Sequence, residues 1–153
     1  MPADAMICAR RRDGIIGWYI SRAKEEPMLP DAVRDLFDGT NFATIASINP
    51  DGAPQASVVW VRTDGDDIVF STLKGRRKHR NMVRDPRVTI VVIDPSDPYR
   101  YIEVRGTVTM EDDPEGTLIR ELSVKYTGET WKEPNPDSER VIVRITPAKV
   151  LVY

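Results

Sequence analysis

The chain has 153 residues, of which 41% are hydrophobic and 30% are charged, as is typical of one globular domain of ordinary size. Its formal net charge is -2 and its pI is about 5.5, which argues against bulk attraction to nucleic acid. It has one cysteine, Cys8, and one histidine, His79, which excludes a disulfide framework, a four-ligand zinc site of these residues and any mechanism that needs two histidines per subunit.

Residues 1–27 differ from the rest of the chain, and we expect them to form an N-terminal extension beside a domain that covers residues 28–153. The extension has no sustained hydrophobic period, although a short helix is expected around Ile15 to Lys24. Its arginine run precedes an apolar stretch, as in a signal peptide, but no small-residue cleavage site follows. Every apolar stretch is far shorter than the roughly 20 residues of a membrane-spanning helix. We therefore expect a cytoplasmic protein that does not associate with membranes.

The first part of the domain has the pattern of a helix followed by an antiparallel meander. Val33, Leu36 and Phe37 lie at helical spacing, and Gly39 ends the helix. The expected strands lie at residues 41–48, 53–62 and 67–72 and are joined by turns at 49–52 and 63–66. Each turn contains a glycine, which accepts the positive φ that tight turns require.

The second part of the domain continues with short helices and strands. A helix begins near Arg76 and is stopped by Pro86, and another begins near Pro114 with apolar residues along one face. The β-branched run at residues 87–94 predicts a strand that is buried on both faces. The remaining expected strands are one at residues 100–110 and one or two at residues 140–153.

These elements predict a mainly β protein with short helices, in the α+β class. About six antiparallel strands suit a small barrel or an α+β sandwich, and closure into a barrel removes the exposed strand edges. The order of the elements is not of the βαβ type, so a Rossmann sheet is not favoured.

The segment from Lys74 to Arg87 is the most unusual part of the sequence, because it carries seven basic residues and one acidic residue in a chain that is acidic overall. It follows the end of a strand and opens a helix, where the free backbone N–H groups and the helix dipole favour an anion. This combination suits a phosphate group. The residues of this predicted phosphate site are Ser71, Thr72, Arg76, Arg77 and Lys78.

Two other interpretations of the basic segment stay open at this point. A short basic helix is often no more than a solvated surface. A nucleic-acid groove would carry aromatic residues among the basic ones, and none lies between Lys74 and Arg87. We therefore expect no nucleic-acid partner.

The sequence offers no set of side chains for acid–base, nucleophilic or metal chemistry. His79 precedes Met82 by three residues, which predicts a packed or hydrogen-bonded histidine rather than a catalytic one. The carboxylates are scattered or lie in turns, and no metal-ligand spacing, nucleophile elbow or Walker loop occurs. We expect no catalytic side chain and no metal, so an enzyme with this sequence would take its reactivity from a cofactor.

From residue 29 onward the sequence resembles the split-barrel flavin-binding proteins related to pyridoxamine 5′-phosphate oxidase. The similarity lies in the segments FATIASINPDGAPQASVVWV, IVFSTLKGRRKHRNMVRDPRVTIVVID and RYIEVRGTVTM. Within that family it is most similar to the branch that uses the deazaflavin coenzyme F420. The resemblance implies a six-stranded antiparallel split β-barrel of the FMN-binding type, assembled as a homodimer with cofactor sites at the subunit interface.

The resemblance also implies roles for individual residues. Arg76 or Arg77, together with Lys78, would bind the cofactor phosphate, with Ser71 and Thr72 next to it. The strand that would run along the ring, joined by Gln55, consists of Ser57, Val58, Val59 and Trp60. Further positive charge for the longer acidic tail of F420 is offered by Lys74, Arg80 and Arg84.

The function implied by this resemblance is that of an F420-dependent oxidoreductase, which transfers a hydride between the coenzyme and a small organic substrate. An FMN-dependent oxidase or reductase of the same fold is the first alternative, because FMN shares the phosphate-bearing core of the deazaflavin. The second alternative is a non-catalytic carrier or sensor of the coenzyme. The physiological substrate and the proton donor stay open.

Overall fold

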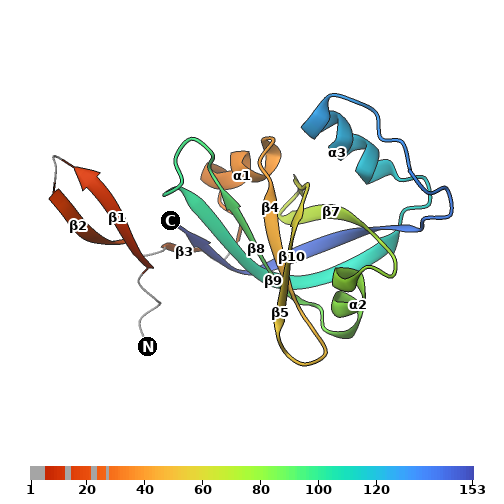
Figure 1. Cartoon of the computed structure of the whole chain (residues 1–153), viewed down its shortest axis with the longest axis horizontal. Helices are drawn as coiled ribbons and strands as arrows, with labels where there is room; N and C mark the ends of the chain where they lie inside the picture. The colour runs from red at the N-terminus through yellow and green to blue at the C-terminus, as the bar shows by residue number, and fades with distance from the viewer. Residues whose placement is uncertain (1–5, 13–14, 22–23, 27) are drawn as a thin grey trace.

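The structure is a computed structural model that describes residues 6–12, 15–21, 24–26 and 28–153 (Figure 1). Three helices and eight strands of residues 24–152 form the domain and its sheet. The helices are α1 (Asp31–Asp38), α2 (Arg77–Arg84) and α3 (Thr117–Thr127). The strands are β3 (Lys24–Glu26), β4 (Ala43–Ile48), β5 (Pro54–Val59), β6 (Arg62–Asp64), β7 (Asp67–Leu73), β8 (Arg87–Ile93), β9 (Tyr101–Asp112) and β10 (Arg140–Val152).

The N-terminal segment contains a hairpin in place of the expected helix. β1 (Met6–Arg12) pairs antiparallel with β2 (Ile15–Ser21), so the prediction of a helix is wrong for the described residues up to Ser21; residues 22–23 lie outside the described ranges. Isoleucine, tryptophan and tyrosine dominate β2, and such residues favour strands, while Gly17 weakens a helix. Farther along, β3 pairs with the end of β10 and so joins the main sheet.

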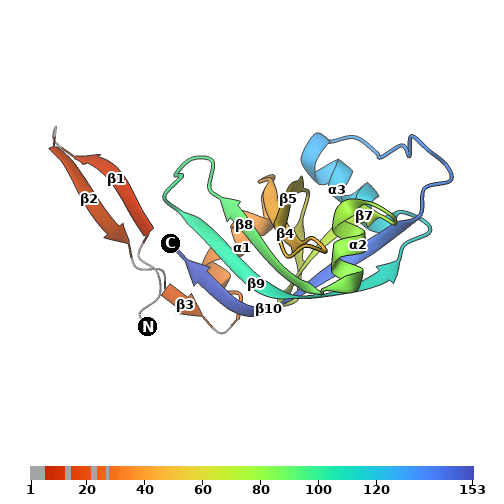
Figure 2. The ribbon, with the colours of Figure 1, turned by 60° about the horizontal axis from the view of Figure 1, so that its bottom comes forward.

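The main sheet follows the order β5-β4-β8-β9-β10-β7-β6, with β3 attached to β10, and every pairing is antiparallel. The long strands β9 and β10 run along the whole barrel, and α2 and α3 lie toward the end away from β3 (Figures 1 and 2). The strands β5 and β6 end the path without pairing with each other. The expected class, mainly antiparallel β with three short helices, is confirmed; the short strands β3 and β6 add to the six expected strands.

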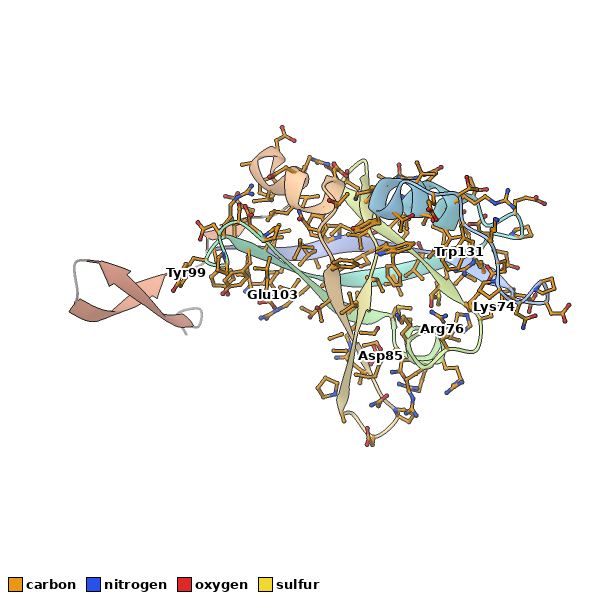
Figure 3. All side chains as sticks on the ribbon, turned by 45° about the horizontal axis from the view of Figure 1, so that its top comes forward. Lys74, Arg76, Asp85, Tyr99, Glu103 and Trp131 are labelled. Atoms are coloured by element: carbon orange, nitrogen blue, oxygen red, sulfur yellow. The ribbon has the colours of Figure 1, made fainter. Side chains whose placement is uncertain are left out.

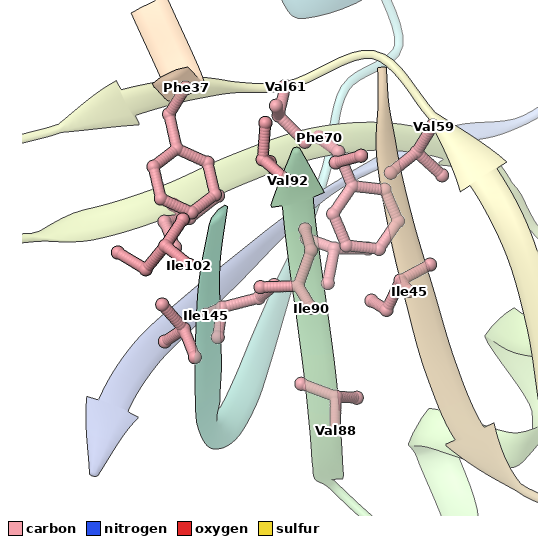
Figure 4. Packing of buried hydrophobic residues seen from close by; sticks show 14 of the residues in the cluster. Phe37, Ile45, Val59, Val61, Phe70, Val88, Ile90, Val92, Ile102 and Ile145 are labelled. Atoms are coloured by element: carbon pink, nitrogen blue, oxygen red, sulfur yellow. The ribbon is translucent and has the colours of Figure 1, made fainter. Parts of the chain in front are cut away.

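One hydrophobic core fills the barrel, and α1 closes it. Figure 4 shows Phe37 of α1 and Phe70 of β7 among aliphatic side chains from the surrounding strands. Val33, Leu36 and Phe37 are buried as their helical spacing predicts. Because Phe37 and Phe70 are fully buried, truncation of either would remove a large apolar contact from the centre of the molecule.

The strand β8 is buried on one face only. Val88, Ile90 and Val92 point into the core, whereas Val91 is half-exposed and Ile93 is 51% exposed. The prediction of burial on both faces is therefore wrong for the single chain. The second face carries Val91 and Ile93 of the same β-branched run together with Arg87 and Thr89, and no layer of the described residues covers it.

The structure divides the expected strand 53–62 into β5 and β6. The break falls at Trp60 and Val61, whose neighbours pair with β4 on one side and with β7 on the other. The hydroxyl of Tyr126 in α3 accepts a hydrogen bond from the Val61 N–H (3.2 Å), and the Lys125 ammonium donates to the Val61 carbonyl (2.5 Å). Side chains of α3 thus replace the strand partners that this backbone loses, which satisfies its buried polar groups.

The start of α3 also differs from the expectation, because the helix begins at Thr117 and not near Pro114. The buried carboxylate of Asp113 accepts hydrogen bonds from the N–H groups of Thr117 (2.8 Å) and Leu118 (3.1 Å). An acceptor at this position satisfies the first helical donors. None of the three helices in the described ranges is long and apolar enough to cross a bilayer.

Candidate functional site

A cleft of about 290 Å³ opens where β5 ends, next to α2 and α3. It brings together four residues of the predicted site, which are Val58, Val59, Trp60 and Arg76. The remaining residues of its lining are Phe42, Ile119, Trp131 and Arg140. Figure 3 shows Arg76 and Trp131 at the same end of the barrel, far from Tyr99 and Glu103.

Stacked aromatic rings form one wall of this cleft. The Trp60 indole stacks on the Tyr126 ring with centroids 5.3 Å apart and planes inclined by 11°. The ring centroid of Phe42 lies 5.6 Å from that of Tyr126, and the Trp131 ring meets Trp60 edge-on with centroids 6.2 Å apart. Such a wall offers flat apolar surface to a planar ring system.

The other end of the cleft is positively charged. Arg76 lines this end, and half-buried Lys78 lies near it. The pKa of the Lys78 ammonium is lowered first by its burial and then by the charge of Arg76. Among the described residues, no carboxylate forms an ion pair with either side chain. Two adjacent cations without a partner, one of them partly desolvated, would be stabilised by a bound anion.

Two hydroxyls of the predicted site are buried without a hydrogen-bond partner in the described part of the chain. They are Ser57 Oγ on β5 and Thr72 Oγ1 on β7. A buried hydroxyl without a partner costs free energy, so such groups in a native structure point to an absent ligand or water. Thr72 lies three residues before Gly75, where the chain turns from β7 toward α2.

The turn between β7 and α2 is fixed by local hydrogen bonds. Gly75 has φ of +81°, a conformation that favours glycine. His79 Nδ1 accepts a hydrogen bond from the Gly75 N–H (3.2 Å), and the Arg80 guanidinium donates to the Gly75 carbonyl. The prediction that His79 is packed or hydrogen-bonded is confirmed. This turn places Arg76 at the cleft immediately before the first residue of α2.

A buried ion pair supports the side of the cleft that α3 and the following loop form. Arg140 is only 7% exposed, and its guanidinium contacts the Glu133 carboxylate at 2.5 Å. It also donates to Ser71 Oγ at 3.3 Å. The hydrogen bond from Arg140, and then the one from the Trp131 indole, keep the pKa of Glu133 below its ordinary value. Ser71 therefore joins this pair and does not line the cleft.

The remaining predicted residues lie outside the lining of the cleft. Ser47 Oγ donates a hydrogen bond to Gln55 at 3.3 Å and accepts one from Asn81 at 3.1 Å. Gln55 therefore belongs to a polar network between β4, β5 and α2. Arg77 is exposed on α2. Lys74 pairs with Asp112 at 2.9 Å and so is already neutralised.

Lys74, Arg80 and Arg84 were expected to offer positive charge to the acidic tail of F420. The two arginines instead donate hydrogen bonds to backbone carbonyls. Arg80 donates to the Gly75 carbonyl, and Arg84 donates to the Ile48 carbonyl. Both side chains are exposed and lack ion-pair partners in the described part of the chain. The charge of Lys74 is compensated by two carboxylates, Asp112 and Glu139, so its proposed role toward the tail stays a prediction.

Half of the cleft lining, and the Tyr126 ring behind it, carry no sequence motif that marks them as site residues. Phe42 lies inside the expected strand 41–48, and Ile119 and Tyr126 lie on the apolar face of the helix expected near Pro114. Trp131 stands in a proline-broken loop without any motif, and Arg140 opens the last strand. A tryptophan in a polar loop was the one signal that could have been noticed.

Comparison with known proteins is consistent with this geometry. Residues 29–153 match the family model described as pyridoxamine 5′-phosphate oxidase. A solved structure described as an F420 reductase is 34% identical, with a TM-score of 0.74 over 80% of this chain and 98% of that one.

Two more distant structures show the fold alone. A conserved hypothetical protein from Mycobacterium tuberculosis is 23% identical, with a TM-score of 0.67 over 83% of this chain and 86% of that one. A pyridoxamine 5′-phosphate oxidase-related, FMN binding protein from Nostoc punctiforme is 15% identical, with a TM-score of 0.54 over 72% of this chain and 73% of that one.

Proposed function

The chain belongs to the pyridoxamine 5′-phosphate oxidase family, and from that membership we propose that it binds coenzyme F420 and uses it to transfer a hydride between the coenzyme and a small organic substrate. The choice of F420 over FMN is supported by the 34% identity with the structure described as an F420 reductase. The relative described as FMN binding is only 15% identical, so its name gives no comparable support for FMN.

One observation carries the proposal: the mainly apolar cleft includes Arg76, which lies beside Lys78, and neither cation forms an ion pair with a carboxylate in the described part of the chain. Val58, Val59 and Trp60 line its apolar part, and Lys78 is half-buried. A molecule with a flat ring and an anionic arm complements both parts. The hydroxyls of Ser57 and Thr72 are buried without a hydrogen-bond partner among the described residues, but neither residue lines the cleft.

In this proposal the protein positions the reactants and excludes water. When bound, the deazaflavin ring supplies the hydride chemistry. The lining of the cleft consists of apolar and aromatic residues and two arginines, without an acid, base or nucleophile. Arg76 and Lys78 would hold the phosphate, and the aromatic wall would fix the plane of the ring, so that the chain contributes orientation and a dry environment.

We also propose that two copies of the chain form a dimer with the coenzyme sites at their interface. The face of β4, β5 and β8 that points away from the core is largely apolar, and no other element of the described residues covers it. Its residues are Thr44, Ala46, Ile48, Pro54, Ala56, Val58, Val91 and Ile93, together with Thr89 and Arg87 at the start of β8. Val58 is 62% exposed and also lines the cleft, so a second copy on this face would reach the mouth of the site.

Parallel titrations of the purified protein with F420 and with FMN test the proposed function. We expect the fluorescence of F420 to change with a dissociation constant of about a micromolar or below, and FMN to bind more weakly. A yellow protein with an FMN spectrum would assign the site to FMN. Tight F420 binding without turnover of quinones, nitro compounds, tetrapyrroles or enones would indicate a carrier or sensor.

A further inference from the structure

A second, smaller cavity lies behind the cleft and shares one wall with it. Its volume is about 130 Å³, and Ile119, Trp131 and Arg140 line both cavities. The room is that of roughly four water molecules, too little for a fused ring system. These three residues therefore form a partition between the two cavities.

The chemistry of the two cavities differs sharply. The larger cavity has no carboxylate in its lining, and its surface is mainly aromatic and aliphatic. The smaller cavity is lined by charged residues of both signs, which are Asp113, Glu115, Glu133, Arg120 and Arg140, and by Ser138. Glu133 is paired with Arg140, and Asp113 accepts hydrogen bonds from the start of α3. A flat apolar molecule suits the first cavity, whereas the second has room only for a substituent of such a molecule.

Trp131 is the part of the partition that comes from a loop, and three contacts fix its indole. Its Nε1–H donates to Glu133 Oε2 at 3.1 Å. The Arg140 guanidinium lies 5.1 Å from its ring centre, and the ring meets Trp60 edge-on at an angle of 89°. Because Arg140 is buried and paired with Glu133, the acceptor that holds the indole is itself held in place.

We propose that Trp131 is a specificity-determining residue, which confines the substrate to the larger cavity and so selects flat, apolar, conjugated molecules without a bulky substituent toward α3. The inference rests on the proposed function, because it takes the larger cavity as the place where the coenzyme ring and the substrate meet. Glu133 and Arg140 act as positioning residues that keep the Trp131 indole between the two cavities.

The test compares the binding of two probes, 2-methyl-1,4-naphthoquinone and its 3-phenyl derivative, to the full chain by calorimetry, with and without F420. We expect the wild type to favour the smaller probe by about tenfold or more. Trp131→Ala should reduce that ratio by about tenfold, because the two cavities then join, and Trp131→Phe should restore most of it. Lys132→Ala, which changes an exposed neighbour in the same loop, should keep the wild-type ratio.

Several outcomes would overturn the inference. A ratio that stays at the wild-type value in folded Trp131→Ala would contradict it, as would failure of the wild type to bind either probe. Should Trp131→Ala not fold, Trp131→Leu provides the same comparison with less loss of apolar contact. If neither F420 nor FMN binds, the proposed function fails, whereas the probe ratio of the coenzyme-free protein still decides whether Trp131 is the partition.

Discussion

The Tyr126 ring of α3 stacks on the indole of Trp60, which lies in the break between β5 and β6, with a centroid distance of 5.3 Å. The Tyr126 hydroxyl donates to the Asn41 carbonyl at 2.7 Å and accepts from the Val61 N–H at 3.2 Å. One side chain of α3 therefore holds both the start of β4 and the break after β5. The cleft exists because this break turns Trp60 toward α3.

Tyr126→Phe should destabilise the protein while leaving the fold intact. The variant keeps the stacked ring but loses the hydroxyl, which leaves the Val61 N–H and the Asn41 carbonyl without that partner. We expect the free energy of unfolding to fall by about 1–3 kcal/mol in urea denaturation. A free energy of unfolding equal to that of the wild type would show that the hydroxyl does not hold the break.

Lys125 gives a dependence of stability on pH whose sign is unusual for a hydrogen-bonded lysine. Burial lowers the pKa of its ammonium to about 8, below the ordinary 10.5. Between these values the unfolded chain binds the proton more strongly than the folded chain does. The contribution of Lys125 to the free energy of unfolding should therefore rise as the pH increases from 8 to 10.5, and it should be constant below 8.

Comparison with Lys125→Met isolates this contribution. The variant removes the donor of the Phe37 and Val61 carbonyls and should lower the free energy of unfolding by about 1–3 kcal/mol at neutral pH. The difference in the free energy of unfolding between the wild type and Lys125→Met should grow as the pH rises from 8 to 10.5 and should be constant below pH 8. A difference that is the same at neutral and at alkaline pH would refute the assigned pKa.

The affinity for an anionic coenzyme should fall as the solution becomes alkaline. In the free protein, burial and then the charge of Arg76 lower the pKa of Lys78 below its ordinary value. A bound phosphate raises that pKa again, so the complex takes up protons in the alkaline range and binds less tightly as the pH rises. Calorimetry in two buffers of different ionisation enthalpy should detect this uptake for the wild type and not for Lys78→Met.

The proposed dimer can be tested with a charge on the uncovered face of the sheet. The wild type should sediment at twice the chain mass of 17.3 kDa. Thr44→Arg, at the centre of the face, should sediment as a single chain, because a buried unpaired guanidinium is costly. Thr117→Arg adds the same side chain at an exposed position of α3 and should stay a dimer. A wild type that sediments as a single chain at micromolar concentration would remove the shared site.

Local sequence patterns predicted the elements whose partners are close in the chain. The helical spacing of Val33, Leu36 and Phe37 and the stop at Gly39 give α1 because the burial of one face decides that helix. The position of the cations at the turn into α2 was also predictable from local sequence, because a strand end, a glycine and a helix start follow one another. Val58, Val59, Trp60 and Arg76 indeed share one cleft, although their binding role stays a prediction.

Features that depend on distant partners were not predictable. The β5–β6 break is stabilised by Tyr126, which lies 65 residues further along the chain than Val61, and no local pattern marks it. Trp131 and Arg140 reach the cleft because a loop folds back over the barrel. The short apolar run of β2 does not by itself distinguish a strand from a helix, and its pairing with β1 makes it a strand.

The measurement that bears most directly on the account is the affinity for F420 of the wild type and of the double variant Arg76→Ala/Lys78→Ala. Lys132→Ala serves as the control for loss of an exposed charge, and thermal unfolding confirms that each variant is folded. We expect the double variant to bind about a hundredfold more weakly or worse, while Lys132→Ala binds as the wild type does. Equal affinities for the wild type and the folded double variant would show that no anionic arm is held where β7 meets α2.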